Sequence, residues 1–150
     1  MKLRNILNPA VITTDVKGAD KESVIKELLD LLVEAREIPS DKTEQVYEDL
    51  MEREKKMSTG IQHGVAIPHA KTKVVKNLVA CIGIKRDGVD FAALDGEPSR
   101  IFIMTLSPVD RVGPHVQFLA EISMVIKEES ARKALLEART EKDVLAVFGL

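Results

Sequence analysis

The sequence predicts an α/β fold in which helices cover both faces of a mixed sheet. The patterns follow one another as strand, two helices, several strands and then further helices, which is the order of a layered α/β protein. Two near-continuous apolar runs, residues 78–84 and 101–106, are typical of strands that are covered on both faces. Of the 150 residues, 45% are hydrophobic, which is enough for a full core, so we expect residues 1–150 to form one domain.

The N-terminal part begins with a strand and continues with a helix. Residues 11–16 are short and β-branched, which predicts a strand. Residues 20–37 carry apolar side chains at helical spacing, and Pro39 ends the pattern. The apolar face of this predicted helix carries Val24, Leu28 and Leu32.

A second helix is predicted from a cap at residue 40 or 41 to about Met57. Its apolar stripe passes through Val46 and Leu50 and then reaches Arg53. An arginine on the inward stripe of a helix is unusual, so Arg53 is a candidate functional residue.

The next segment, residues 58–70, contains two glycines and a proline that break any helix. Within it, residues 65–67 form a short apolar strand that ends at Pro68. Because proline fixes its own φ and biases the preceding residue towards extended geometry, the chain that leads into His69 is stiff. We therefore expect a rigid turn that presents His69 at the end of a strand.

After the two apolar strands, the helical pattern returns from about Pro114. Residues 130–138 predict a further helix. Thr140 and Asp143 have the spacing of a capping box, which predicts a last short helix that ends near Phe148. The inward face of the first of these helices carries His115, Leu119, Ile122 and Ile126.

Composition excludes several classes of function. The net charge of −2 offers no basis for binding nucleic acid. The single cysteine, Cys81, forms no internal disulfide and is expected to be a buried apolar residue in a reducing compartment. The sequence shows neither a signal peptide nor an apolar run as long as a membrane span, so we expect a cytoplasmic protein without membrane insertion.

The methionines expected to fill the core are Met51, Met57, Met104 and Met124.

Three histidines carry all the imidazole chemistry that the chain can perform: His63, His69 and His115. A free imidazole has a pKa of about 6.5, so it is largely neutral and nucleophilic near neutral pH. The N–P bond that an imidazole forms is labile, which allows a phosphoryl group to move onward. His69 is the candidate for this chemistry because of its stiff position.

A phosphoryl group brings negative charge and acceptor oxygens, so it needs cations and donors. The guanidinium of Arg53 can bind two phosphate oxygens in parallel. Ser58, Thr59 and the amides around Gly60 are candidate phosphate-binding donors, and His115 is a candidate donor from its helix.

Each candidate also has a structural interpretation. A histidine on an apolar helix face, such as His115, is often a packing residue, and Arg53 can extend its stem past a core edge. Thr59-Gly60 can be only a turn, and we favour a solvent-facing loop position for His63.

Two other function classes remain as alternatives. A metal hydrolase would use the three histidines, but the spacing of His63 and His69 is not that of a helical metal pair and no carboxylate lies at a ligand-like offset. We therefore expect neither a metal nor another cofactor. A binding module that has lost phosphorylation is the other alternative, and intact His69, Arg53 and His115 argue against it.

Several strings of the sequence form a combined motif: residues 52–55, 58–61, 64–70, 90–91 and 94–98, and Pro108-x-Asp110 followed by His115. Together they resemble the signature of the fructose/mannitol-type (type 2) enzyme IIA domains of the bacterial phosphoenolpyruvate-dependent phosphotransferase system. This family includes a nitrogen-regulatory branch, and the resemblance extends from about Leu3 to Phe148.

The resemblance implies a three-layer α/β/α sandwich with a mixed central sheet. It implies that His69 is the phosphorylated histidine, that His115 is the second active-site histidine and that Arg53 is the arginine beside them. The implied donor is the carrier HPr or its nitrogen-branch relative, and the implied acceptors are a cysteine on a IIB domain or regulatory target proteins.

The expected function is therefore that of a phosphohistidine carrier. The free-standing length and the string Ser58-Thr59-Gly60-Ile61 favour a stand-alone protein of the nitrogen-regulatory type. The alternative is the IIA component of a fructose/mannitol-type sugar uptake system that hands phosphate to a IIB cysteine.

Overall fold

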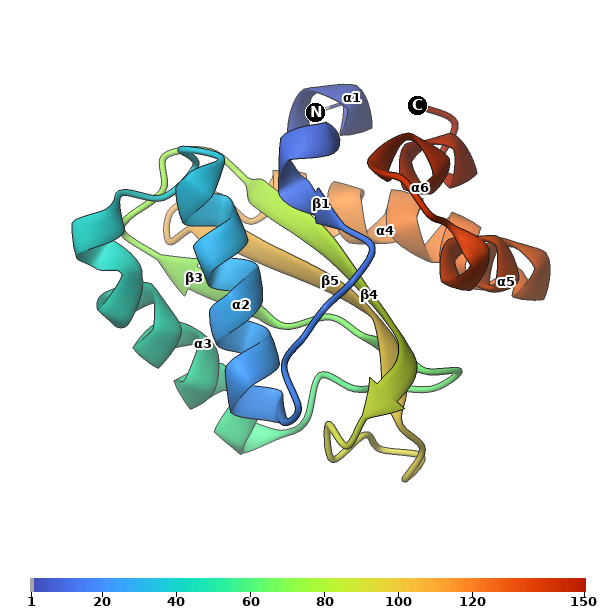
Figure 1. Ribbon diagram of the computed structural model, residues 1–150. Helices are drawn as coiled ribbons and strands as arrows, with labels where there is room; N and C mark the ends of the chain where they lie inside the picture. The colour runs from blue at the N-terminus through green and yellow to red at the C-terminus, as the bar shows by residue number, and fades with distance from the viewer. Residues whose placement is uncertain (1) are drawn as a thin grey trace.

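A mixed sheet forms the middle layer of the protein (Figure 1). The computed structural model describes residues 2–150, and within them the sheet has five strands. The central pair, β4 and β5, is antiparallel, whereas β1 runs parallel to β4, and β2 and β3 run parallel to β5. The strands are β1 (Ile12–Thr13), β2 (Val65–Ala66), β3 (His69–Thr72), β4 (Val79–Val89) and β5 (Ser99–Pro108).

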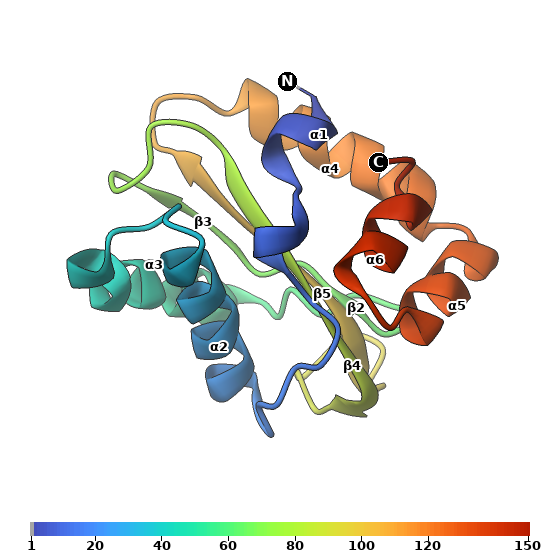
Figure 2. The same ribbon diagram turned by 45° about the horizontal axis from the view of Figure 1, so that its top comes forward.

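Helices cover both faces of this sheet, which confirms the predicted three-layer α/β/α sandwich. Figure 2 shows α2 and α3 on one side of the sheet and α4, α5 and α6 on the other. The layer of two helices consists of α2 (Lys21–Glu34) and α3 (Thr43–Lys56). The other layer consists of α4 (Gly113–Ile126), α5 (Glu129–Glu137) and α6 (Glu141–Val147). The short helical turns are α1 (Leu3–Ile6), η1 (Pro9–Val11) and η2 (Ser40–Lys42).

The first strand is shorter than its sequence predicts. Of residues 11–16, only Ile12 and Thr13 form β1, because Val11 ends the 3-10 turn η1. The helix predicted over residues 20–37 ends at Glu34, and Arg36 takes up a left-handed φ of 63°.

Two hydrogen bonds cap the end of α2. The amide of Arg36 donates to the carbonyl of Val33, and the amide of Glu37 donates to the carbonyl of Leu32. This pair of bonds is a Schellman motif, which satisfies the last carbonyls of a helix and turns the chain out of it.

The capping box predicted for the last helix is confirmed. The hydroxyl of Thr140 accepts from the amide of Asp143 at 3.1 Å, and the carboxylate of Asp143 accepts from the amide of Thr140 at 3.2 Å. The pKa of Asp143 lies below its usual value, first because the amide of Arg139 donates to its carboxylate and then because the amide of Thr140 does so.

The core is mostly aliphatic, with Phe91, Phe102 and Phe118 fully buried in it, and it lies on both faces of β4 and β5. Cys81 is fully buried in β4, and burial raises the pKa of its thiol well above the usual range, as expected for an unreactive packing residue.

The methionines do not all fill the core. Met104 is buried, but the prediction is wrong for Met57 and Met124, which are 58% and 66% exposed. Met57 follows the last turn of α3, and Met124 lies on α4 away from its buried residues Phe118, Ile122 and Ile126.

Over residues 2–150, none of the helices combines the length and the apolar character that a membrane crossing requires.

Candidate functional site

The strands β2 and β3 follow one another along the same edge of β5. They are separated by Ile67 and Pro68, and the carbonyl of Pro68 accepts a hydrogen bond from the amide of Thr105 at 3.0 Å. Proline is tolerated here because an edge strand needs no donor on its outer side. The register is the same on both sides of the proline: Val65 lies opposite Ile101, Ala66 opposite Phe102 and His69 opposite Thr105.

His69 therefore begins a strand, whereas the sequence predicted a turn at the end of one. The stiffness that Pro68 was expected to provide is reinforced by pairing with β5 on both sides of the proline. The strand alternation of β3 directs Ala70 and Thr72 inward and leaves His69 and Lys71 on the outer face.

The imidazole of His69 is partly buried and held by one hydrogen bond. Its Nδ1 lies 2.9 Å from the carbonyl oxygen of Ile67. A carbonyl oxygen only accepts, so Nδ1 carries the proton and donates. In the neutral ring this leaves the lone pair on Nε2, the nitrogen available as a nucleophile.

His115 lies beside His69. The ring centroids are 5.5 Å apart and the planes are inclined by 35°. His115 belongs to the first turn of α4, and its Nδ1 lies 3.4 Å from the hydroxyl oxygen of Thr105. Burial first, and then the charges of His69 and Lys71, lower the pKa of His115 below its usual value. At neutral pH the ring of His115 is therefore uncharged.

Arg53 lies in the last turn of α3 and shares a pocket with His69. Its Nη1 donates to the carbonyl of Met57 at 2.8 Å, which anchors one end of the guanidinium. The pocket has a volume of about 380 Å³. It is lined by Asp49, Glu52, Arg53, Lys56, His69, Ala70 and Lys71. The fold thus brings together a cation and an imidazole that lie 16 positions apart in the sequence.

The segment that follows α3 is held by internal hydrogen bonds. The hydroxyl of Ser58 donates to the carbonyl of Phe91 at 2.8 Å and accepts from the amide of Gly60 at 3.1 Å. The amide and the hydroxyl of Thr59 donate to the two carboxylate oxygens of Glu54, at 2.9 and 2.7 Å. The donors predicted to bind phosphate therefore have partners inside the protein, and their role in phosphate binding stays a prediction.

Glu54 is the buried centre of that arrangement. Its side chain is 2% exposed, and its carboxylate also forms an ion pair with Lys21 of α2 at 3.0 Å. Glu54 thus connects the segment after α3 to both helices of this layer.

His63 lies outside this group. It is exposed, has a positive φ of 58°, and lines a different pocket together with residues of α4, among them Ile122 and Ile126. These positions agree with the solvent-facing loop that the sequence favours. Among residues 2–150, the histidines, cysteines and carboxylates form no group of three or more that could hold a metal ion.

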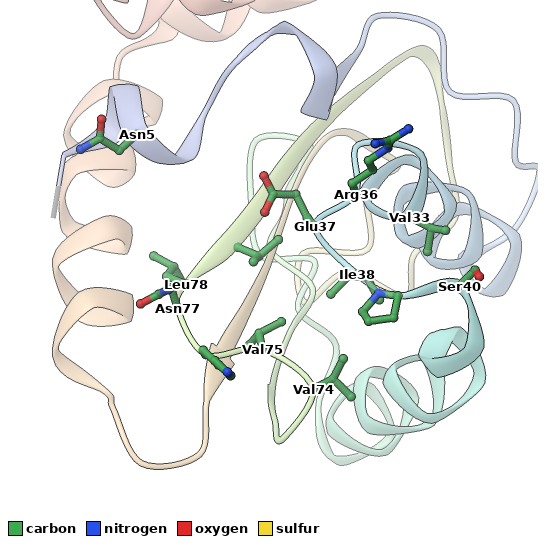
Figure 3. A pocket seen from close by; sticks show the side chains of 13 residues that line it. Asn5, Val33, Arg36, Glu37, Ile38, Ser40, Val74, Val75, Asn77 and Leu78 are labelled. Atoms are coloured by element: carbon green, nitrogen blue, oxygen red, sulfur yellow. The ribbon is translucent and has the colours of Figure 1, made fainter.

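A larger pocket, of about 730 Å³, lies elsewhere. Figure 3 shows that its side chains come from α1, from the end of α2 and the chain after it, and from the segment that leads into β4. None of the candidate residues lines it, so pocket size does not locate the site.

Two residues of the site, Lys71 and Thr105, are not predicted from the sequence. Lys71 follows His69 at the spacing of two that places side chains on one face of a strand, but β3 was not predicted as a strand. Thr105 is the one polar residue in the apolar run 101–106, and this was the signal that could have identified it.

Fold and site together define a class of protein: an α/β/α sandwich with a pair of histidines and an arginine at the edge of its mixed sheet. The chain belongs to the EIIA 2 family of the phosphoenolpyruvate-dependent sugar phosphotransferase system, whose family model matches residues 5–149. It is a phosphocarrier of the EIIA type, a phosphotransfer component of that system.

Relatives of two kinds are similar to this chain. A fructose-specific EIIA component of Haloferax volcanii is 36% identical over 91% of this chain and 89% of its own length. A fructose-specific EIIABC component of Bacillus subtilis is 34% identical over 99% of this chain, which spans only 23% of that relative's length. The crystal structure of the nitrogen regulatory protein IIA-Ntr from Neisseria meningitidis superimposes with a TM-score of 0.88 at 30% identity, covering 97% of this chain and 98% of that one.

Proposed function

We propose that this protein accepts a phosphoryl group on His69 and passes it on to a further protein. The donor is the phosphohistidine form of HPr or of a nitrogen-branch HPr-like protein. The observation that carries the proposal is the hydrogen bond from Nδ1 of His69 to the carbonyl of Ile67, because it leaves a fixed lone pair on Nε2.

In the transfer step, Nε2 of His69 attacks the phosphorus of the donor's phosphohistidine. The new N–P bond forms as the donor's N–P bond breaks, and the bonding electron pair returns to the donor's imidazole. The ring of His69 keeps its proton on Nδ1. The carbonyl of Ile67 stabilises the positive charge that the ring gains, because it accepts that N–H.

Three groups support the negative charge of the transferring phosphoryl group. Arg53 lines the same pocket as His69 and offers the part of its guanidinium that does not bind Met57. Lys71 lies on the same face of β3. His115 stands in the first turn of α4, where the partial positive charge of a helix N-terminus favours an anion. Charge stabilisation of this kind is the main protein contribution to phosphoryl transfer.

The onward acceptor is a regulatory target in the nitrogen-type version of the proposal and a IIB cysteine in the sugar-uptake version. The similarity to a nitrogen regulatory protein over nearly the whole of both chains supports the first version. The fructose-specific relatives at 34% and 36% identity support the second version equally well. The phosphoryl donor and acceptor that react with this chain distinguish the two.

The test is a labelling assay with radioactive phosphate, run once with a sugar-type and once with a nitrogen-type phosphorylated donor. We expect an acid-labile, base-stable label on the protein, and no label on the variant His69→Ala. His63→Ala is the matched control, because His63 is exposed and lies outside the pocket of His69, so this variant should label fully. Full labelling of His69→Ala would overturn the proposal.

His115→Ala should slow the uptake of the label, its release to the acceptor, or both. Unchanged rates in both steps would assign His115 to packing alone.

A further inference from the structure

We infer that Thr105 is a positioning residue that holds His115 with its ring proton on Nε2, so that His115 presents an N–H donor beside His69. The role of this N–H donor in binding a phosphoryl group rests on the proposed function. The tautomer itself is a property of the unphosphorylated protein and is tested without phosphate.

Thr105 contacts both parts of the structure that carry the histidines: it pairs with the edge strand of His69, and its hydroxyl lies near the ring of His115. It lies on β5 directly opposite His69, and its amide donates to the carbonyl of Pro68 at 3.0 Å. Its relative exposure is 0%. The position of its side chain is therefore set by the central strand of the sheet rather than by a mobile loop.

The hydroxyl of Thr105 has one partner among residues 2–150, which is Nδ1 of His115 at 3.4 Å. A buried hydroxyl needs an acceptor for its proton, and buried groups are rarely left without one. The lone pair of Nδ1 in a neutral ring is the acceptor that the structure offers. A separation of 3.4 Å is long for this bond, and such bonds commonly tighten when a site is occupied.

The ring of His115 is neutral at neutral pH, because burial and the charges of His69 and Lys71 lower its pKa. A neutral imidazole carries one proton, so an acceptor role for Nδ1 places that proton on Nε2. The opposite tautomer would turn a lone pair towards the oxygens of a phosphoryl group, which repels them.

The two histidines then hold complementary tautomers because their Nδ1 atoms face different partners. The carbonyl of Ile67 can only accept, so His69 keeps its proton on Nδ1 and offers a lone pair from Nε2. The hydroxyl of Thr105 can donate, so His115 offers a lone pair from Nδ1 and a proton from Nε2. One ring is thus arranged to attack phosphorus and the other to bind its oxygens.

The test compares Thr105→Val with Thr105→Ser in protein whose histidines are labelled with ¹⁵N. Valine keeps the branched shape of threonine and replaces the hydroxyl with a methyl group, whereas serine keeps the hydroxyl. The ¹⁵N chemical shifts of each ring report which nitrogen carries the proton. We expect the Nε2–H tautomer of His115 in the unaltered protein and in Thr105→Ser, and a shift towards the Nδ1–H tautomer in Thr105→Val.

In the labelling assay, Thr105→Val should transfer phosphate roughly tenfold more slowly, and Thr105→Ser should stay within about threefold of the unaltered protein, as expected for one orienting hydrogen bond. The ¹⁵N shifts of His69 should not change, which shows that the edge of the sheet is intact.

Any of three results would overturn the inference: an Nδ1–H tautomer of His115 in the unaltered protein, an unchanged tautomer in Thr105→Val, or an unchanged transfer rate in Thr105→Val. The first measurement needs no variant, so it decides the tautomer even if Thr105→Val does not fold. A failure of the proposed function is distinguishable, because it would show as full labelling of His69→Ala while the tautomers remain as inferred.

Discussion

At the scale of single residues, the site depends on what each ring nitrogen and each cation contacts. His69 and His115 are the same residue type at 5.5 Å from one another, yet one Nδ1 meets a carbonyl and the other a hydroxyl. Arg53 is held at one end by the carbonyl of Met57, so its guanidinium is partly oriented before a phosphoryl group arrives. Because these contacts already restrict the side chains of His69, His115 and Arg53, little further side-chain entropy is lost when a phosphoryl group binds.

Replacing Arg53 by alanine should slow phosphoryl transfer roughly 100-fold, because the main cation of the pocket is lost. Arg53→Lys should restore only part of the rate, since an ammonium group cannot bind two oxygens in parallel as a guanidinium does. The rates of label uptake from the phosphorylated donor measure both effects. Arg4→Ala, at an exposed arginine of α1, is the control. A normal rate in Arg53→Ala would assign the arginine to capping of α3.

Replacing Lys71 by methionine should raise the pKa of His115 towards its ordinary value, because one of the charges that lower it is removed. The increase should be incomplete, since burial is the larger cause and remains. Titration of the ring followed by NMR measures the change. Lys73→Met, at an exposed lysine beyond the end of β3, is the control and should leave the pKa unchanged. An unchanged pKa in Lys71→Met would contradict the assignment of this charge.

The same shift makes stability depend on pH. The pKa of His115 is lower in the folded than in the unfolded chain, so the unfolded chain takes up its proton first as the pH falls. The free energy of unfolding should therefore decrease from pH 6.5 down to the folded pKa and level off below it. Urea unfolding across this range should show a smaller decrease for Lys71→Met than for the unaltered protein.

At the scale of elements, the C-terminal end of α3 joins the core to the site. Arg53 and Glu54 are neighbours in sequence, but Arg53 faces the pocket of His69 whereas Glu54 is buried against Thr59 and Lys21. Successive positions of a helix lie about 100° apart, so one turn can serve both purposes. The carboxylate of Glu54 holds the segment that follows α3, and the guanidinium of Arg53 binds the carbonyl of Met57 at the start of that segment.

Glu54→Gln should lower the free energy of unfolding by about 2 kcal/mol, because an amide nitrogen cannot accept from Thr59 and the ion pair with Lys21 is lost. It should also slow transfer through His69, because the segment that Glu54 holds through Thr59 follows Met57, whose carbonyl binds the guanidinium of Arg53. Urea unfolding and the labelling assay measure the two effects. Glu48→Gln, at an exposed glutamate of the same helix, should change neither. Wild-type stability in Glu54→Gln would show that the buried carboxylate is dispensable.

At the scale of the whole molecule, the central strands hold the two helical layers and the site in one framework. α2 approaches β4 closely at Gly83, where an added Cβ would lie 2.7 Å from side-chain atoms of both Leu28 and Val16. Strand β5 lies next to β4 and carries Thr105, which contacts the edge strand and α4. The α2 layer and the edge strand that carries His69 are therefore connected through the same two central strands, β4 and β5.

Gly83→Ala should lower the free energy of unfolding by about 2 kcal/mol, because the added methyl group forces the α2 layer away from β4. Gly113→Ala is the matched variant: nothing lies within 4 Å of its added Cβ, and Gly113 is the first residue of α4. It should change the free energy of unfolding by no more than about 0.5 kcal/mol, because the gain from replacing glycine is offset by the Cβ that alanine places before Pro114. Urea unfolding measures both changes, and equal effects of the two variants would contradict the close approach at Gly83.

Much of the fold is predictable from the sequence because periodicity and caps are local. The helices α2 and α3, the apolar strands β4 and β5 and the capping box of Thr140 and Asp143 agree with the sequence pattern. Strand β3 was missed because its four residues carry no apolar alternation and depend on β5 for their hydrogen bonds. The exposure of Met57 and Met124 was missed because residue type alone does not tell which face of an element meets the core.

The sequence by itself determined the order of the layers and the stiff approach to His69, and it named the three residues of the proposed site, His69, Arg53 and His115. Only the tertiary structure decided that Arg53 and His69 line one pocket, that Thr105 contacts His115, and that Nδ1 of His69 faces the carbonyl of Ile67. The physical reason is the range of the interactions. Neighbouring residues in the sequence set the apolar face of a helix and the restraint that a proline imposes. The tautomer of an imidazole depends instead on the group that lies next to its ring nitrogen, and sheet register and the packing of α4 decide which group that is.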